Sequence, residues 1–151
     1  MSDPLPPGTF VYKGGKALEY DTYDYSNIVH AIVDPTIIKL DDEAFEDCIK
    51  LVSIRLPDGV TEIGNYAFDG CSSLSSINLP DGVMEIGDYA FDGCSSLSSI
   101  HLPDGVTEIG DCAFANCKLL SSIRLPDGVT EIGKYAFSNC KLLPSSAFPT
   151  E

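Results

Sequence analysis

Apolar residues recur along this chain at an interval of 23 positions. The segment L-P-D-G-V begins at Leu56, and within one unit Leu74, Ile77 and Leu79 follow the order L-x-x-I-x-L. That order is typical of a short strand whose isoleucine and final leucine face a core. The L-P-D-G-V segment begins again at Leu79, Leu102 and Leu125. Because the pattern returns at a constant interval, it predicts a stack of similar coils that share one continuous core.

The rest of each unit predicts a turn followed by a short helical segment. Residues 80–82 (P-D-G) indicate a tight turn, because proline lacks a ladder donor and glycine permits a positive φ. Val83 and Ile86 form a second apolar pair, which ends at Gly87. In the segment 89–97 (Y-A-F-x-x-C-x-x-L) the apolar residues lie three positions apart, which predicts a single helical or 3₁₀ turn.

Five such units account for most of the chain. The first is divergent, since Val33 replaces the opening leucine while Phe45 and Cys48 keep their columns. In the last unit, Pro144 and Ser146 replace a serine and an isoleucine. The predicted organisation is an N-terminal cap at 1–32, repeats at 33–55, 56–78, 79–101, 102–124 and 125–147, and the start of a truncated further repeat at 148–151.

The segment before the repeats has a different pattern. Residues 10–15 (F-V-Y-K-G-G) predict a strand that enters a turn, and residues 28–33 (I-V-H-A-I-V) predict a first strand. Tyr20, Tyr23 and Tyr25 lie between them among acids. We expect this segment to cover the open end of the core, because the terminal units of a repeat protein must present a polar outer face.

Together these elements predict a solenoid. Strands of successive coils would lie side by side in parallel, about 4.8 Å apart. The usual hand of parallel crossovers makes such a stack right-handed. The expected fold class is therefore α/β or mainly β, with about five 23-residue coils, a parallel sheet on one face and short helical or 3₁₀ turns on another.

The unit C-x-x-L-x-x-I-x-L-P-x-G-V-x-x-I-G-x-x-A-F resembles the BspA-type leucine-rich repeat, also called the Treponema pallidum-type class. The resemblance covers about residues 33–147. Members of this type occur on bacterial and protist surfaces and are implicated in adhesion and protein binding. The resemblance therefore implies a leucine-rich-repeat solenoid that binds other proteins, and it supplies no catalytic residues to carry over.

Charge and hydropathy narrow the range of partners. The net charge is −14, from 23 acids against 9 bases, which disfavours nucleic acid and anionic membrane surfaces. No apolar run approaches the roughly 18 residues that span a bilayer, so membrane insertion is not expected. The first residues do not resemble a signal peptide, and free cysteines would favour an intracellular location. The cell surface is the alternative if the chain is a piece of a longer protein.

The six cysteines divide into a column and one outlier. Structural zinc sites use ligand pairs two to four residues apart, whereas these cysteines occur once per unit. We therefore predict buried, reduced thiols and neither metal nor cofactor. Cys112 instead occupies a tyrosine column, so it is expected to lie nearest the surface and to be the most reactive thiol. The column consists of Cys48, Cys71, Cys94, Cys117 and Cys140.

Two further columns are acidic. A calcium ion needs six to eight oxygens that converge on one point, and single carboxylates at coil spacing do not obviously provide them. Solvated surface acids are therefore expected, with cation binding as the alternative. The aspartate column is Asp58, Asp81, Asp104 and Asp127, and the glutamate column is Glu62, Glu85, Glu108 and Glu131.

Catalysis is not expected. Serine is abundant, but a serine nucleophile needs a positioned base. His30 and His101 lie in different settings and neither repeats with the serines, which argues against a Ser-His-Asp site. No polar cluster interrupts the repeat, so we predict that the protein is not an enzyme. A threonine column that Met84 interrupts leaves ice binding as a weaker alternative.

The outward side of the predicted sheet is the candidate partner-binding face. Because Ile77 and Leu79 point inward, Ser76 and Asn78 point outward. The column that contains Asn78 also holds two of the nine basic residues and a histidine, which suits a partner protein with acidic or hydrogen-bonding groups. The candidate residues are Ser53, Arg55, Ser76, Asn78, Ser99, His101, Ser122 and Arg124.

A structural role is the alternative function. The units are nearly identical, and no amphipathic capping helix follows the last one. An exposed final coil presents apolar surface and strand edge, both of which promote association. The alternative is therefore a self-assembling repeat protein that associates end to end.

Overall fold

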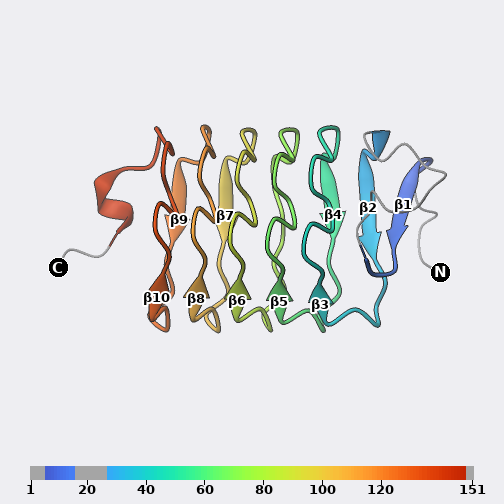
Figure 1. Ribbon diagram of the computed structural model, residues 1–151, viewed down its shortest axis with the longest axis horizontal. Helices are drawn as coiled ribbons and strands as arrows, with labels where there is room; N and C mark the ends of the chain where they lie inside the picture. Colours follow the sequence, from blue (N-terminus) through green and yellow to red (C-terminus); the bar gives the residue numbers. More distant parts are fainter. Residues whose placement is uncertain (1–5, 16–26, 149–151) are drawn as a thin grey trace.

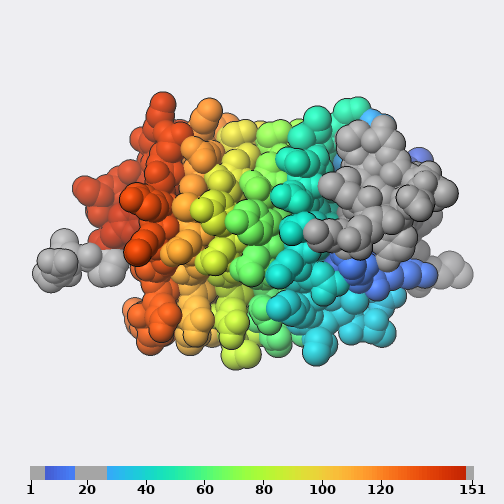
Figure 2. Space-filling model, viewed as in Figure 1, coloured from blue at the N-terminus to red at the C-terminus, as the bar shows by residue number. Residues whose placement is uncertain are grey.

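The computed structural model describes residues 6–15 and 27–148. Over these residues the chain forms a straight stack of coils, with the first strands at one end and the last coil at the other (Figure 1). The successive repeats appear as adjoining bands that cross the visible face of the molecule (Figure 2). A 3₁₀ helix, η3 (Ser145–Ala147), follows the last strand. The strands are β1 (Thr9–Tyr12), β2 (His30–Val33), β3 (Lys39–Leu40), β4 (Ser53–Arg55), β5 (Glu62–Ile63), β6 (Glu85–Ile86), β7 (Ser99–His101), β8 (Glu108–Ile109), β9 (Ser122–Arg124) and β10 (Glu131–Ile132).

Parallel pairing occurs on two faces of the stack, where the sequence predicted one. The Glu-Ile strands form a five-stranded sheet in the order β10-β8-β6-β5-β3, and we call its outer side the glutamate face. The predicted Ser-Ile strands β4, β7 and β9 lie in the sheets β1-β2-β4 and β7-β9, and we call the shared outer side of these sheets the serine face. Between these two sheets, the repeat 56–78 contributes only a bridge from Asn78 to His101. The second face was missed because two-residue strands are too short to show an alternating pattern.

The third side of each coil consists of hydrogen-bonded turns, and the predicted helical turn is absent from the described repeats. Successive amides alternate between two partners, as the Phe91 N–H bonds the Ala113 carbonyl of the next coil at 2.7 Å, while the Asp92 N–H bonds Tyr89 O at 3.1 Å. Tyr89 (φ 56°) and Gly93 (φ 70°) both adopt left-handed backbone. These two residues break the helical course, and alternate amides are free to pair between coils.

A phenylalanine column runs through the core. Phe91 is fully buried and stacks on Phe68 and Phe114, with ring centroids 5.2 Å away on each side. This confirms the predicted inward column. A full turn of the chain thus places one aromatic ring directly over the ring of the preceding coil.

The cysteine column lies beside these rings, and its thiols bond to backbone. The thiol of Cys94 donates to Phe68 O at 3.2 Å, and Cys117 donates to Phe91 O at the same distance. Four column members are buried as predicted, but Cys140 is only half-buried, which corrects the expectation for the fifth. The reason is that no further full coil covers the repeat 125–147 among the described residues. The buried members are Cys48, Cys71, Cys94 and Cys117.

The two ends of the stack differ from the middle. At the N-terminal end, β1 and β2 pair in parallel with the same sheet as β4, and Tyr12 packs on Phe45 with centroids 5.1 Å apart. At the other end, Phe148 packs on Phe137 at 5.1 Å. The division into a cap and repeats stays a prediction. Three tyrosines of the predicted cap lie outside the described residues, namely Tyr20, Tyr23 and Tyr25, and so do residues 149–151.

Candidate functional site

All eight candidate residues are exposed on the serine face. In β4, β7 and β9 the middle isoleucine is buried and the residues on either side are exposed, as strand alternation requires. In the repeat 56–78, Ile77 is likewise buried between exposed neighbours. The exposed residues are the serines Ser53, Ser76, Ser99 and Ser122, and the polar residues Arg55, Asn78, His101 and Arg124.

Strand register gathers these residues into two straight rows. Ser99 is paired with Ser122, and His101 is paired with Arg124. The bridge from Asn78 to His101 extends the second row toward the N-terminus. Neighbours in a row are therefore about 4.8 Å apart, and the first and last arginines of the row are separated by roughly 14 Å.

Two residues that sequence analysis did not assign extend the rows by one more coil. Register places His30 beside Ser53 and Ile32 beside Arg55. His30 Nδ1 lies 2.8 Å from Ser53 Oγ. The signal was present in the sequence, because residues 30 and 32 precede 53 and 55 by one period. His30 and His101 thus share one face in neighbouring rows, which corrects the expectation that their settings differ.

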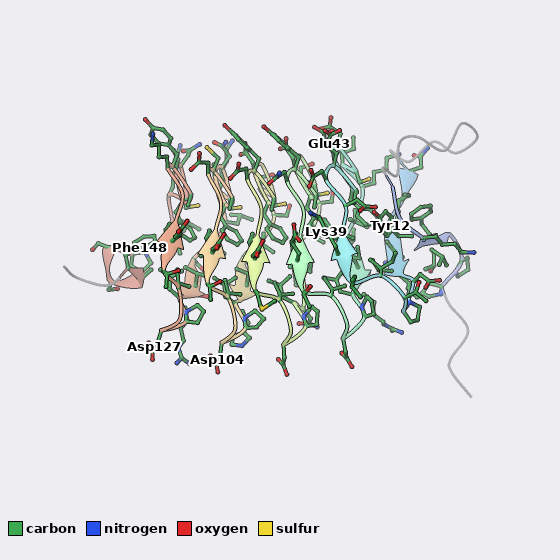
Figure 3. The ribbon with its side chains drawn as sticks, turned by 60° about the horizontal axis from the view of Figure 1, so that its bottom comes forward. Tyr12, Lys39, Glu43, Asp104, Asp127 and Phe148 are labelled. Carbon is green, nitrogen blue, oxygen red and sulfur yellow. The ribbon has the colours of Figure 1, made fainter. Side chains whose placement is uncertain are left out.

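Charge is segregated between the two sheets. Every outward strand residue that the structure describes on the serine face is uncharged, a histidine or an arginine. On the other sheet, register aligns four glutamates in one row, namely Glu62, Glu85, Glu108 and Glu131. In Figure 3, Lys39 lies on this glutamate face, Asp104 and Asp127 project from one edge of the coils, and Glu43 lies at the opposite edge. The serine face is therefore an acid-free strip on a protein of net charge −14.

A groove of about 440 Å³ follows the glutamate row. Its lining includes the consecutive isoleucine and glycine of the repeats, which we call the I-G step, as at Ile86 and Gly87. At the N-terminal end of the row Lys39 forms an ion pair with Glu62, which raises the pKa of Lys39. Among the described residues, no group of three or more His, Cys, Asp and Glu side chains is arranged to hold a metal ion.

The variable position next to this groove has a structural role. Its Asn65, Asp88 and Asp111 side chains each accept a hydrogen bond from the backbone of the next coil, as from Asp88 N to Asn65 Oδ1 at 2.8 Å and from Asp111 N to Asp88 Oδ1 at 2.7 Å. The series ends at Lys134, whose N–H bonds Asp111 Oδ1. Variation at this position is therefore constrained by stacking, whereas the serine-face side chains point away from the coils.

The repeat length, the parallel strands of successive coils and the continuous apolar core define a leucine-rich-repeat solenoid. The sequence matches the BspA type leucine rich repeat region in six copies over residues 16–147. The chain therefore belongs to the BspA-type leucine-rich repeat family. Comparison with curated protein sequences gives no significant match. No helix in the described part of the chain is long and apolar enough to cross a bilayer.

Three solved structures are similar to the chain, each at 38% identity. The T. pallidum leucine rich repeat protein has a TM-score of 0.74, with 76% of this chain and 56% of that chain covered. A leucine rich cell surface protein from Faecalibacterium prausnitzii has a TM-score of 0.73, with 77% and 31% covered. A leucine-rich repeat protein from Bacteroides ovatus has a TM-score of 0.72, with 76% and 32% covered. The chain thus spans between about a third and about half of the length of these relatives.

Proposed function

We propose that this chain is a non-catalytic protein-binding module and that the serine face contacts the partner. One observation carries the proposal: the serine face is the acid-free strip of a very acidic molecule. Its rows are straight, and their side chains extend from hydrogen-bonded strands. A regular, rigid surface of this kind limits the ordering entropy that a partner must overcome.

The partner should carry acidic or hydrogen-bonding groups along an extended segment. Arg55 and Arg124 offer guanidinium donors at the two ends of the polar row, with Asn78 and His101 between them. The short serines of the neighbouring row leave room for a backbone to approach. Complementary charge of this type contributes mainly to specificity and association rate.

Reversal of the two arginines tests the proposal. A partner captured with the parent chain should lose most of its affinity for the double variant Arg55→Glu and Arg124→Glu, while the thermal midpoint stays nearly unchanged. The matched control is Lys118→Glu with Lys134→Glu, which makes the same change of net charge at exposed positions outside the serine face. An equal loss of affinity in both double variants would mean that net charge, and not the serine face, determines binding. Undiminished binding to the arginine variant would exclude the serine face.

Self-association through the last coil is a second candidate function, and a contrast in burial favours it. Ile132 is 46% exposed, whereas the equivalent Ile109 is 2% exposed. Leu142 is also exposed, and a hollow of about 510 Å³ separates the last coil from η3. Exposed apolar surface of this kind promotes association.

Light scattering over a concentration series tests this second candidate. The parent chain should show a mass that rises with concentration, and Ile132→Asp with Leu142→Asp should abolish the rise. Leu119→Asp is the control, because Leu119 is 51% exposed in the middle of the stack. A parent that stays monomeric at every concentration would exclude self-association.

A further inference from the structure

A column of tyrosines is in register with Glu43, since residues 43, 66, 89, 112 and 135 are one period apart and share left-handed backbone. Figure 3 labels Glu43 at one edge of the coils. Tyr66 and Tyr89 stack face to face, with centroids 4.8 Å apart and planes 3° from parallel. In the next repeat the column is interrupted, because Cys112 takes the tyrosine position. Tyr135 resumes the column one coil later and is 73% exposed.

The backbone at the interruption is the same as at the tyrosines. Tyr89, Cys112 and Tyr135 have φ values of 56°, 52° and 59°, all in the left-handed region. The amides of Tyr89 and Cys112 both bond the carbonyl of the residue before the equivalent position in the next coil, at 2.8 and 2.9 Å. Only the side chain differs, so the repeat 102–124 has the backbone of the tyrosine position but no aromatic ring there.

The core shows how much room this leaves. Phe68 and Phe114 lie two coils apart and hold the ring of Phe91 between them, at 5.2 Å from each. Tyr89 and Tyr135 are likewise two coils apart, about 10 Å at the usual strand spacing. In the phenylalanine column, the same separation of two coils accommodates one aromatic ring. The residue between Tyr89 and Tyr135 in the tyrosine column is the half-buried Cys112.

We propose that the gap between Tyr89 and Tyr135, above Cys112, is an anchor site for one aromatic side chain of a partner protein. A flat ring inserted there stacks on Tyr89 as Tyr66 does on its other side, and covers the exposed ring of Tyr135. Aromatic anchors in such slots are common centres of protein interfaces. The site lies apart from the serine face, so it does not depend on the function proposed for that face.

Disulfide exchange at Cys112 tests the site in the unmodified chain. The protein is equilibrated with a mixture of two disulfide reagents, one that transfers a benzylthio group and one that transfers a cyclohexylmethylthio group. The two groups are similar in size and apolarity, but only the benzyl ring is flat enough to stack between two tyrosines. Peptide mass mapping then gives the ratio of the two adducts at each cysteine. We expect the benzyl adduct to be favoured roughly two- to tenfold at Cys112.

Two comparisons make the result specific. Half-buried Cys140 in the same molecule lacks the tyrosine walls and should show a ratio near one. The variant Tyr89→Ala with Tyr135→Ala keeps the thiol and should lose the preference, whereas Tyr89→Phe should keep it. A ratio near one at Cys112 in the parent chain would overturn the proposal. So would a preference that persists when both tyrosine walls are removed.

A free ligand gives an independent check. Saturation-transfer NMR with N-acetyl-tyrosinamide should show contact with the Cys112→Ser variant, which leaves the gap open. Cys112→Tyr restores the column and should abolish that contact. If Cys112→Tyr does not fold, the triple variant Cys112→Ser, Tyr89→Ala and Tyr135→Ala replaces it. Contact with N-acetyl-tyrosinamide should also be lost in that variant, because both tyrosine walls are absent. Contact that survives removal of the walls or filling of the gap would refute the site.

Discussion

The glycine of each I-G step is the residue that sets how closely two coils can stack. A Cβ placed on Gly110 would lie 2.5 Å from Asp88 N, well inside contact distance. Gly105 differs, because a Cβ there would meet only ordinary contacts, the closest being Val83 O at 3.6 Å. We therefore expect Gly110→Ala to lower the free energy of unfolding by about 3 kcal/mol.

The matched control for this change is Gly105→Ala, which should alter the free energy of unfolding by less than about 1 kcal/mol. Urea unfolding of the two variants measures the difference. Equal effects would mean that the coils can separate at the I-G step without loss of packing.

Cysteine reactivity should separate the buried column from the two accessible thiols. Burial raises the pKa of Cys48 to about 12, and it raises the pKa of Cys71 and Cys94 as well. Because the thiolate is the reactive form, these cysteines should modify slowly in the native protein. Cys112 and Cys140 are half-buried and should react first.

Native and denatured thiol counts check this prediction. Mass mapping after brief alkylation should place label at Cys112 and Cys140, and all six cysteines should react in denaturant without reductant. Rapid native labelling of Cys71 or Cys94 would show that the coils open far more readily than their packing indicates.

The turn on the third side of the coils carries a pH-sensitive carboxylate. Partial burial raises the pKa of Asp69 to about 6, with further contributions from the carboxylates of Asp92, Glu46 and Asp47. Between about pH 4 and pH 6 the folded chain therefore keeps a proton that the unfolded chain has released. The contribution of Asp69 to stability accordingly falls as pH rises through this window.

The variant Asp69→Asn removes this titration. We expect it to unfold at a higher temperature than the parent at pH 7, and the advantage should disappear below about pH 4. Asp81→Asn on the exposed P-D-G turn is the control, since it removes one charge away from this carboxylate group. An advantage of Asp69→Asn that is equal at both pH values would point to a cause other than ionisation.

The elements show which parts of the fold can be predicted from sequence. The strands β4, β7 and β9 were predictable because an isoleucine stands between two polar residues in each of the first four repeats. The strand around Ile86 was not, since two residues carry no periodicity. The turn around Tyr89 was wrongly predicted as helical, because an apolar spacing of three fits both a helical turn and the turn that is observed. The observed turn needs a left-handed backbone at Tyr89, and a tyrosine in the sequence does not indicate that conformation.

The candidate site divides in the same way. The serine rows could be predicted, since alternation fixes which side chains of a strand point outward. Their extension to His30 and Ile32 was missed because the first unit is divergent. The tyrosine column could be found by alignment of repeats, but its stacking could not. The stacking depends on backbone geometry that places Tyr66 directly over Tyr89.

At the scale of the whole molecule, each of the repeats 56–78, 79–101 and 102–124 contributes one residue to every row. The serine rows, the glutamate row and the phenylalanine column all follow from one register between neighbouring coils. A coil contacts only the coils before and after it, so stability should be a sum over coils and their interfaces. The repeat 79–101 should then be dispensable as a unit.

Removal of residues 79–101 tests this additivity. The deletion joins Asn78 to Leu102 and recreates the junction between Asn78 and Leu79, so every column remains in register. We expect a folded, cooperative protein with a smaller urea m-value, because less surface is exposed on unfolding. Removal of 79–100 instead leaves one extra residue and turns each later strand to its opposite face, so that variant should not fold. If both deletions fold equally well, the register between coils does not hold the molecule together. If neither folds, the coils are not independent units.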